Sequence, residues 1–183
     1  PPPPPPPPPL FFFKHTPAYE LLRSLVGSEM CIRDIMKKNE IKSKTLELLE
    51  MVELTPAEEF LYKFPHEMSG GECQRVCIAR ALCSNPDLII ADEPTSMLDV
   101  SIRSDILNLF IKLKEEFNLS ILLITHDIAS ASICSQDIIV LKKGKIVESG
   151  PCENIIKSPK HDYTKNLISA SMDDWLKNNS KVK

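Results

Sequence analysis

The sequence predicts an α/β domain whose core is a parallel β-sheet with helices packed against it. Two short apolar runs, residues 88–91 and 120–124, have the length of β-strands. Apolar runs without polar alternation are typical of parallel strands that are covered on both faces. The segment between them has apolar residues at helical spacing, and Asp99 can cap that helix. These apolar residues are Ile102, Ile106, Leu109, Phe110, Leu113 and Phe117. Strand, helix and strand in this order form a crossover unit, which is right-handed in nearly all proteins.

Residues 1–34 are left out of this predicted fold. Nine consecutive prolines open the chain, and three phenylalanines follow them after Leu10. Polyproline is an extended rod without internal hydrogen bonds, so it cannot join a hydrophobic core. Its functional alternative is a ligand for an aromatic groove. Because residues 19–34 look like translated sequencing-adapter sequence, we expect residues 1–34 to be a non-native or disordered leader.

The part of the chain after the leader begins with helices. Apolar residues at helical spacing predict a surface helix over residues 41–54. The sequence Thr55-Pro56-Ala57-Glu58 predicts a second helix, with Thr55 as its cap and Pro56 in its first turn. Pro65 should end that helix.

A third helix is predicted from Ser69 to about Ser84. Ser69 and Glu72 have the spacing of a capping box, in which each side chain binds the backbone of the other residue. The helical pattern places Gln74, Arg75 and Arg80 toward solvent. It predicts a buried side made of Val76, Cys77, Ala79, Ala81 and Leu82.

The last third of the chain is predicted to alternate short elements. A short helix is expected at residues 129–134. A hairpin with strands at 138–141 and 145–147 should turn at Lys142-Lys143-Gly144. Gly150-Pro151 should break the second strand, and short helices near residues 154–157 and 163–170 should lead to a polar tail.

Composition excludes several classes of function. The formal net charge of −3 and an isoelectric point near 5.9 give no broad basic surface for nucleic acid. No apolar run approaches the roughly 20 residues of a membrane-spanning helix, and no signal peptide is recognisable. The six cysteines form no C-x-x-C pair. Cys73 and Cys77 would need further ligands to hold a metal, so we expect them to be packing residues in a reducing compartment.

Both predicted strands end in polar residues that can do chemistry. Asp92-Glu93 follows the first strand, and Thr125-His126-Asp127 follows the second. In open α/β sheets, ligands bind at the carboxyl ends of the strands. Either group alone has a plain structural explanation, because an acidic pair can be a polar loop and a single histidine is usually structural. Their occurrence together predicts a binding site.

These motifs resemble those of an ABC-type ATPase. Residues 64–71, followed by Gln74-Arg75-Val76, are similar to the signature region of that family. Residues 88–99 are similar to the Walker B motif with its D-loop, and His126 is similar to the switch histidine. The resemblance covers roughly residues 41–170. Residues 158–164 also resemble the tail of ATPases from peptide and nickel importers.

The resemblance implies ATP and Mg²⁺ as ligands. Asp92 would hold Mg²⁺ through its water shell. Glu93 would orient the attacking water or accept its proton, and His126 would donate to the γ-phosphate.

It also implies a dimer. The resemblance implies that Ser69, Gly70 and Gly71 contact the nucleotide of a second ATPase subunit. A helix start suits a phosphate, because it offers N–H groups and a positive dipole end. Asp99 would communicate across the same interface. The second subunit can be identical or different.

Two features depart from the family pattern. The signature's usual glutamine is Glu72 here, followed by Cys73, and a carboxylate there can repel phosphate unless capping turns it to its own backbone. The chain has no G-x-x-x-x-G-K-[ST] segment, and its five glycines are at positions 27, 70, 71, 144 and 150. We therefore expect a partial P-loop NTPase domain with its P-loop strand missing, an unpaired edge on strand 120–124, and an inactive chain when alone.

The expected organisation has four segments: the leader at 1–34, a helical subdomain with the signature motif at 35–84, the Walker B and switch-histidine half of the catalytic core at 85–150, and a helical extension and tail at 151–183. The implied function is that of the carboxy-terminal part of an ATPase subunit, which powers import of peptides or metal complexes. Its partners would be the second ATPase subunit, membrane permease subunits and, indirectly, a solute-binding protein, with no nucleic acid. It would be cytoplasmic and peripheral on the inner face of the cell membrane. Two alternatives stay open: a non-transport ABC ATPase of DNA repair or translation, and an inert or regulatory fragment that pairs with an intact subunit.

Overall fold

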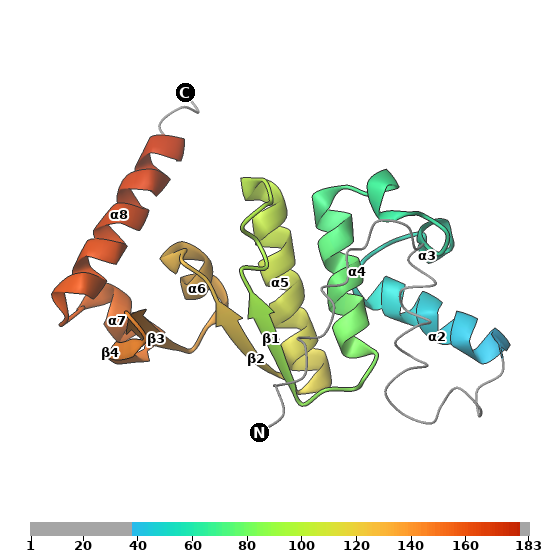
Figure 1. Ribbon diagram of the computed structural model, residues 1–183, viewed down its shortest axis with the longest axis horizontal. Coiled ribbons are helices and arrows are strands. Elements are labelled where there is room, and N and C mark those ends of the chain that lie inside the picture. The colour runs from blue at the N-terminus through green and yellow to red at the C-terminus, as the bar shows by residue number, and fades with distance from the viewer. Residues whose placement is uncertain (1–37, 180–183) are drawn as a thin grey trace, which may run out of the picture. The chain divides into compact units, whose positions relative to one another are not determined.

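The computed structural model describes residues 38–179 of the 183-residue chain, and the side chains of residues 40–170. The leader predicted at residues 1–34 lies outside the described residues. The chain divides into two compact units, one ending at Asn85 and the other beginning at Pro86. Each unit has its own helices (Figure 1). Each also has its own buried apolar side chains.

The described part of the first unit, from Lys38 onward, is helical. Its elements are α2 (Lys38–Met51), the single-turn α3 (Ala57–Phe60), the 3-10 turn η2 (Pro65–Glu67) and α4 (Gly70–Leu82). α2 packs against both α3 and α4. The buried core draws on all three helices and on residues that follow α2 and α3: Leu48, Leu49, Val52, Leu54, Phe60, Leu61, Val76, Ile78 and Leu82.

The predicted start of α3 is wrong in detail. Pro56, not Thr55, is the residue before the helix, and no side chain caps it. A proline fits there because its missing N–H would have no partner inside the helix. The helix also ends after one turn, at Phe60, rather than continuing to Pro65.

The second unit begins with the predicted crossover. β1 (Leu88–Asp92) is followed by α5 (Val100–Phe117) and β2 (Ser120–Ile124). The two strands are parallel and in register from Leu88 beside Ser120 to Asp92 beside Ile124. α5 starts after Asp99 and ends before Asn118, whose φ of 51° is left-handed. The strand, helix and strand order is therefore confirmed.

The expectation that both strands are covered on both faces is wrong for the described residues. Ile89 and Ala91 are buried, but Leu88 and Ile90 are 50% and 61% exposed. On β2, Leu122 is 47% exposed. An apolar strand can be buried on both faces, but its composition does not show that another element covers it. The elements described between Pro86 and Asn179 leave one face of the β1–β2 pair in contact with solvent.

The remaining elements follow in the predicted order. They are α6 (Ile128–Cys134), β3 (Asp137–Lys142), β4 (Lys145–Pro151), α7 (Cys152–Lys157) and α8 (Asp162–Asn179). No helix in the part of the chain that the structure describes is long and apolar enough to cross a membrane.

The predicted β3–β4 hairpin is confirmed, and the backbone of its turn explains why glycine occurs there. Lys143 and Gly144 have φ values of 50° and 75°. Two successive positive values define the turn that best suits the twist of a two-residue hairpin. β4 continues through Gly150 to Pro151, so the predicted break comes after those residues instead of before them.

Candidate functional site

The signature turn is the amino-terminal end of α4, residues 69–71. Ser69 is the residue before the helix, and its Oγ accepts the N–H of Glu72 at 3.3 Å. The Glu72 carboxylate accepts the N–H of Ser69 at 2.6 Å. Both halves of the predicted capping box are therefore present.

The orientation of Glu72 shows whether its charge can repel a phosphate at the signature turn. Its carboxylate is turned back onto the helix start, and the N–H of Ser69, then the Ser69 hydroxyl, hold the pKa of Glu72 below its usual value despite partial burial. A carboxylate in this position is satisfied by its own backbone. Gly70 is exposed and Gly71 is buried, so the turn presents its backbone next to solvent at Gly70.

Two side chains of α4 do not lie where the helical pattern placed them. Arg75, predicted to face solvent, has a side chain only 15% exposed. Its Nη1 donates to the carbonyl oxygen of Val52 at 2.7 Å and to Oε2 of Glu53 at 2.9 Å. Cys77, predicted to be buried, is exposed. Among the described residues, no group of three or more possible metal ligands is present.

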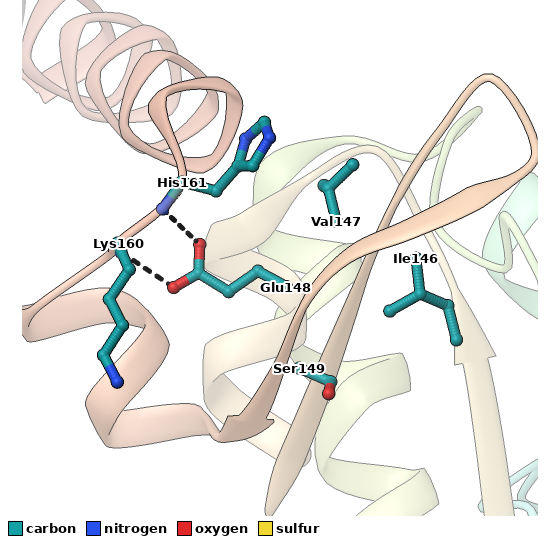
Figure 2. A pocket seen from close by; sticks show the side chains of 6 residues that line it. All are labelled: Ile146, Val147, Glu148, Ser149, Lys160 and His161. Atoms are coloured by element: carbon teal, nitrogen blue, oxygen red, sulfur yellow. Dashed lines mark hydrogen bonds between the residues drawn. The ribbon is translucent and has the colours of Figure 1, made fainter.

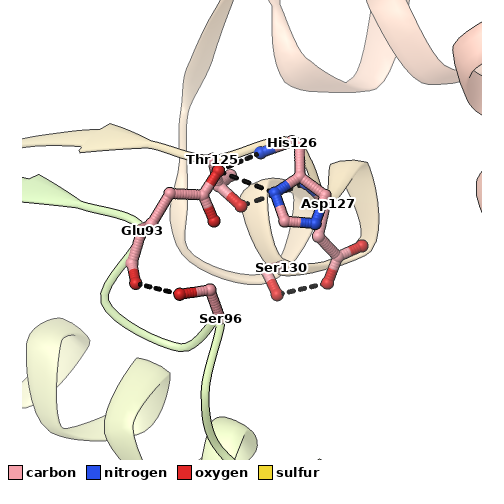
Figure 3. A network of polar contacts seen from close by, with 6 residues as sticks. All are labelled: Glu93, Ser96, Thr125, His126, Asp127 and Ser130. Carbon is pink, nitrogen blue, oxygen red and sulfur yellow. Dashed lines mark hydrogen bonds and ion pairs between the residues drawn. The ribbon is translucent and has the colours of Figure 1, made fainter.

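The carboxyl ends of β1 and β2 bring Glu93 and His126 together (Figure 3). The Oε1 atom of Glu93 accepts the backbone N–H of His126 at 3.0 Å and lies 2.7 Å from Nδ1 of its ring. The Glu93 N–H in turn donates to the carbonyl of Ile124 at 2.8 Å. This last bond continues the strand pairing one residue beyond β1 and fixes the spacing of the two side chains.

Glu93 has an unusual backbone. Its φ is 47°, in the left-handed region that residues other than glycine rarely adopt. The Ser96 hydroxyl and the Ser96 N–H both donate to the Glu93 carbonyl, at 3.0 Å and 3.3 Å. These bonds hold the turn that follows β1.

Asp127 has a structural role beside this pair. Its Oδ1 accepts the Ala129 N–H at 3.0 Å, and its Oδ2 accepts the Ser130 hydroxyl at 2.6 Å. Its own N–H donates to Oγ1 of Thr125 at 3.0 Å (Figure 3). Asp127 therefore caps α6, and it fixes the chain directly after His126.

The other two predicted carboxylates lie at the same end of the crossover unit. Asp92 is the last residue of β1 and is exposed. Asp99 precedes α5, is exposed, and makes no capping bond with its side chain. Its carbonyl accepts the Arg103 N–H at 2.9 Å, so its backbone alone starts the helix.

A second polar cluster in the same unit was not predicted from sequence. Figure 2 shows the Glu148 carboxylate beside the start of α8, where it accepts the N–H groups of Lys160 at 2.8 Å and His161 at 3.1 Å. Nδ1 of His161 accepts the Tyr163 N–H at 3.0 Å. A shallow groove here is lined by Ile146, Val147, Glu148, Ser149, Lys160 and His161.

These contacts give the tail motif at residues 158–164 a structural explanation. Thr164 is fully buried, and its hydroxyl meets no partner at full hydrogen-bond geometry. That hydroxyl, lying near Glu148, and then the Lys160 N–H hold the pKa of Glu148 below its usual value. The Nζ atom of Lys142 lies 4.6 Å from the centre of the Tyr163 ring. The motif thus fastens the start of α8 to the β3–β4 hairpin.

Comparison with known proteins places these features in a family. The family model described as ABC transporter matches residues 13–96. The glutathione import ATP-binding protein GsiA of Pectobacterium atrosepticum is 43% identical over 141 residues, which are 77% of this chain and 22% of GsiA. The chain belongs to the ABC transporter ATP-binding family. The oligopeptide transport ATP-binding protein AppD of Bacillus subtilis is 44% identical to this ABC chain over 135 residues, 74% of it and 41% of AppD. The chain therefore spans less than half the length of these curated relatives.

The fold of the ABC chain is likewise confirmed by solved structures. The dimeric ABC transporter cassette MJ0796 matches it with a TM-score of 0.63 at 36% identity, covering 76% of this chain and 58% of the cassette. A post-hydrolysis structure of the same cassette contains ADP and Pi. The expected partial α/β domain of the P-loop NTPase class is thus confirmed.

Proposed function

We propose that this chain is part of an ATPase subunit that hydrolyses ATP to power the import of peptides across a membrane. The observation that carries the proposal is the contact between Glu93 and His126 at the neighbouring ends of β1 and β2. The names of the relatives support the substrate class, since GsiA is a glutathione import protein and AppD an oligopeptide transport protein. The negative net charge of −3 supports a partner other than nucleic acid.

Glu93 is the proposed general base. Its side chain is 36% exposed, so it can contact water, while its backbone is fixed by Ile124 and Ser96. A fixed carboxylate beside the γ-phosphate can orient a water molecule and accept its proton. Proton transfer of this kind typically contributes about 10²-fold to 10⁴-fold to a rate.

His126 is the proposed donor to the γ-phosphate, and its geometry sets a condition on its protonation. The Nδ1 atom lies against Glu93, so a neutral ring that donates from Nδ1 leaves an Nε2 that can only accept. Donation from Nε2 to phosphate therefore requires the doubly protonated ring, or a ring turned away from Glu93. The side chain is 77% exposed, which leaves room for both the ligand and the rotation.

We propose that Mg²⁺ binds at the end of β1. Asp92 and Glu93 place two carboxylates in succession at the edge of the strand pair, and Mg²⁺ prefers oxygen ligands and retains several of its waters. We assign Asp92 to hold the ion through that water shell. Bound Mg²⁺ would neutralise phosphate charge during transfer.

The signature turn is proposed to work on ATP held by a second ATPase subunit. Ser69, Gly70 and Gly71 begin α4, where backbone N–H groups and the helix dipole favour an anion. Asp99, whose side chain makes no capping bond, would contact that subunit. The dimeric state of the MJ0796 cassette supports this arrangement.

The remaining partners follow from the relatives. An importer ATPase subunit is expected to bind membrane permease subunits and, through them, to respond to a solute-binding protein. We therefore propose a cytoplasmic location on the inner face of the membrane, reached through the permease. Co-purification with permease subunits from membranes checks this proposal.

Substitution of Glu93 tests the proposed chemistry. In the full-length subunit that contains this chain, assembled with its permease, Glu93→Gln should retain ATP binding and lower phosphate release by about 100-fold or more. Glu116→Gln, an exposed residue of α5, is the matched control and should keep the wild-type rate. Unchanged phosphate release in the Glu93 variant would overturn the assignment.

A further inference from the structure

The first unit holds a charged contact that the proposed function does not use. Arg75 extends from α4 to the carboxyl end of α2, where Nη1 donates to the Val52 carbonyl at 2.7 Å and to the Glu53 carboxylate at 2.9 Å. The Arg75 side chain is 15% exposed, and that of Glu53 is 47% exposed. The Arg75 side chain is therefore mostly removed from water, and its Nη1 atom has two acceptors.

This contact completes the end of α2. The chain leaves the helix at Glu53, where φ is 60°, and the N–H of Leu54 returns to the Leu49 carbonyl at 2.9 Å. The Val52 carbonyl then receives its donor from Arg75 rather than from the backbone that follows. A cation at this position also interacts favourably with the negative end of the helix dipole. Removing the guanidinium would leave a buried carbonyl without that partner.

α4 is anchored unequally along its length. The large apolar side chains that it buries, Val76, Ile78 and Leu82, lie from its midpoint onward, whereas its first turn buries only Gly71. A second contact near the start is that of the Cys73 Sγ with the Pro65 carbonyl at 3.5 Å, and a thiol is a weak donor. Arg75 thus ties the first half of α4 to the end of α2 through a charged side chain.

We propose that Arg75 is a positioning residue for the signature turn. By fixing the first half of α4 to the end of α2, it sets the direction in which the Gly70 and Gly71 N–H groups point. Hydrogen bonds to phosphate need donor distances within a few tenths of an ångström, and a misplacement of about 1 Å can lower a rate about 100-fold. The inference rests on the proposed ATPase function, because the turn has a ligand to meet only in that setting.

The test compares Arg75→Gln, Arg75→Lys and Lys44→Gln in the full-length subunit with its permease. Arg75→Gln should lower kcat by about tenfold and leave KM for ATP within about twofold, because the opposing subunit holds the nucleotide. Arg75→Lys should recover part of the loss, since an ammonium group can still donate to both acceptors. Lys44→Gln removes an exposed ion pair of the same 2.9 Å length in the same unit and should leave kcat unchanged.

Two further comparisons separate positioning from stability. Leu82→Ala creates a cavity at the far end of α4, so at an equal fall in melting temperature it should retain more kcat than Arg75→Gln. Equal losses in the two variants would overturn the inference, and so would an Arg75→Gln subunit with wild-type kcat. An inactive wild-type complex would overturn the proposed function, and this inference with it. An active wild type with an equally active Arg75→Gln variant would overturn this inference alone.

Discussion

Glu72 offers a direct test of how the signature turn is held. Its carboxylate accepts the Ser69 N–H at 2.6 Å, while the Ser69 hydroxyl accepts the Glu72 N–H at 3.3 Å. Glu72→Ala removes the first bond and leaves the second. Glu72→Gln keeps an acceptor oxygen on a side chain of the same length and removes only the negative charge. The two substitutions therefore separate the contribution of the hydrogen bond from that of the charge.

The expected magnitudes follow from these contacts. A partly exposed capping bond contributes about 1 kcal/mol, and the interaction of a carboxylate with the helix dipole about 0.5 kcal/mol. In Glu72→Ala, the higher helix propensity of alanine offsets about 0.3 kcal/mol of this loss. Glu72→Ala should therefore lower the free energy of unfolding by about 1 kcal/mol, and Glu72→Gln by about 0.5 kcal/mol.

The pH dependence supplies a second, independent readout. The Ser69 N–H lowers the pKa of Glu72 in the folded state, so the carboxylate's contribution is present above its usual pKa of 4.5 and is lost as pH falls through the lowered value. Urea unfolding of both variants and the wild type at about pH 7 and about pH 3 measures the contribution. Equal stability of Glu72→Ala and wild type at neutral pH would refute the reasoning, as would a Glu72→Gln deficit that does not shrink in acid.

Two further predictions concern the pKa values of other groups. Burial raises the pKa of the Cys83 thiol from 9.0 to about 11. Alkylation of Cys83 at about pH 9 should therefore be about 50-fold slower in the folded protein than in urea, because the thiolate fraction falls from about one half to about one hundredth. Mass spectrometry of the peptide measures the rate, and equal rates would contradict the burial. The Thr164 hydroxyl and the Lys160 N–H lower the pKa of Glu148. The difference in melting temperature between wild type and Glu148→Gln should therefore be largest above about pH 5 and should diminish as pH falls below 4.5. A difference that grows in acid would contradict the assignment of Glu148 as a bound carboxylate.

The parts of the fold that follow from local chemistry were predictable. The capping box of Ser69 and Glu72 lies within four consecutive residues, and the hairpin turn at Lys143 and Gly144 within two, so a short stretch of sequence contains every group that forms it. The placement of Glu93 beside His126 also followed from a general rule, because parallel strands bring their carboxyl ends to one edge. Their catalytic roles stay predictions.

The features that sequence reasoning missed depend on residues far apart in the chain. Arg75 was predicted to face solvent from the helical pattern, yet its acceptors are 22 and 23 positions away. Glu148 binds N–H groups 12 and 13 positions away, and no periodic pattern marks such a pair. The exposed face of β1 was missed for a similar reason, because an apolar strand does not identify the element that covers it.

The left-handed backbone of Glu93 limits what evolution can place at that position. For a side chain with a β-carbon this conformation is about 1 kcal/mol less favourable than the ordinary one, and glycine or asparagine would adopt it more readily. Glycine and asparagine therefore suit the turn but lack a carboxylate, whereas glutamate has the carboxylate but is less suited to the turn. A random library at position 93, selected once for folding and once for turnover, should return different amino acids.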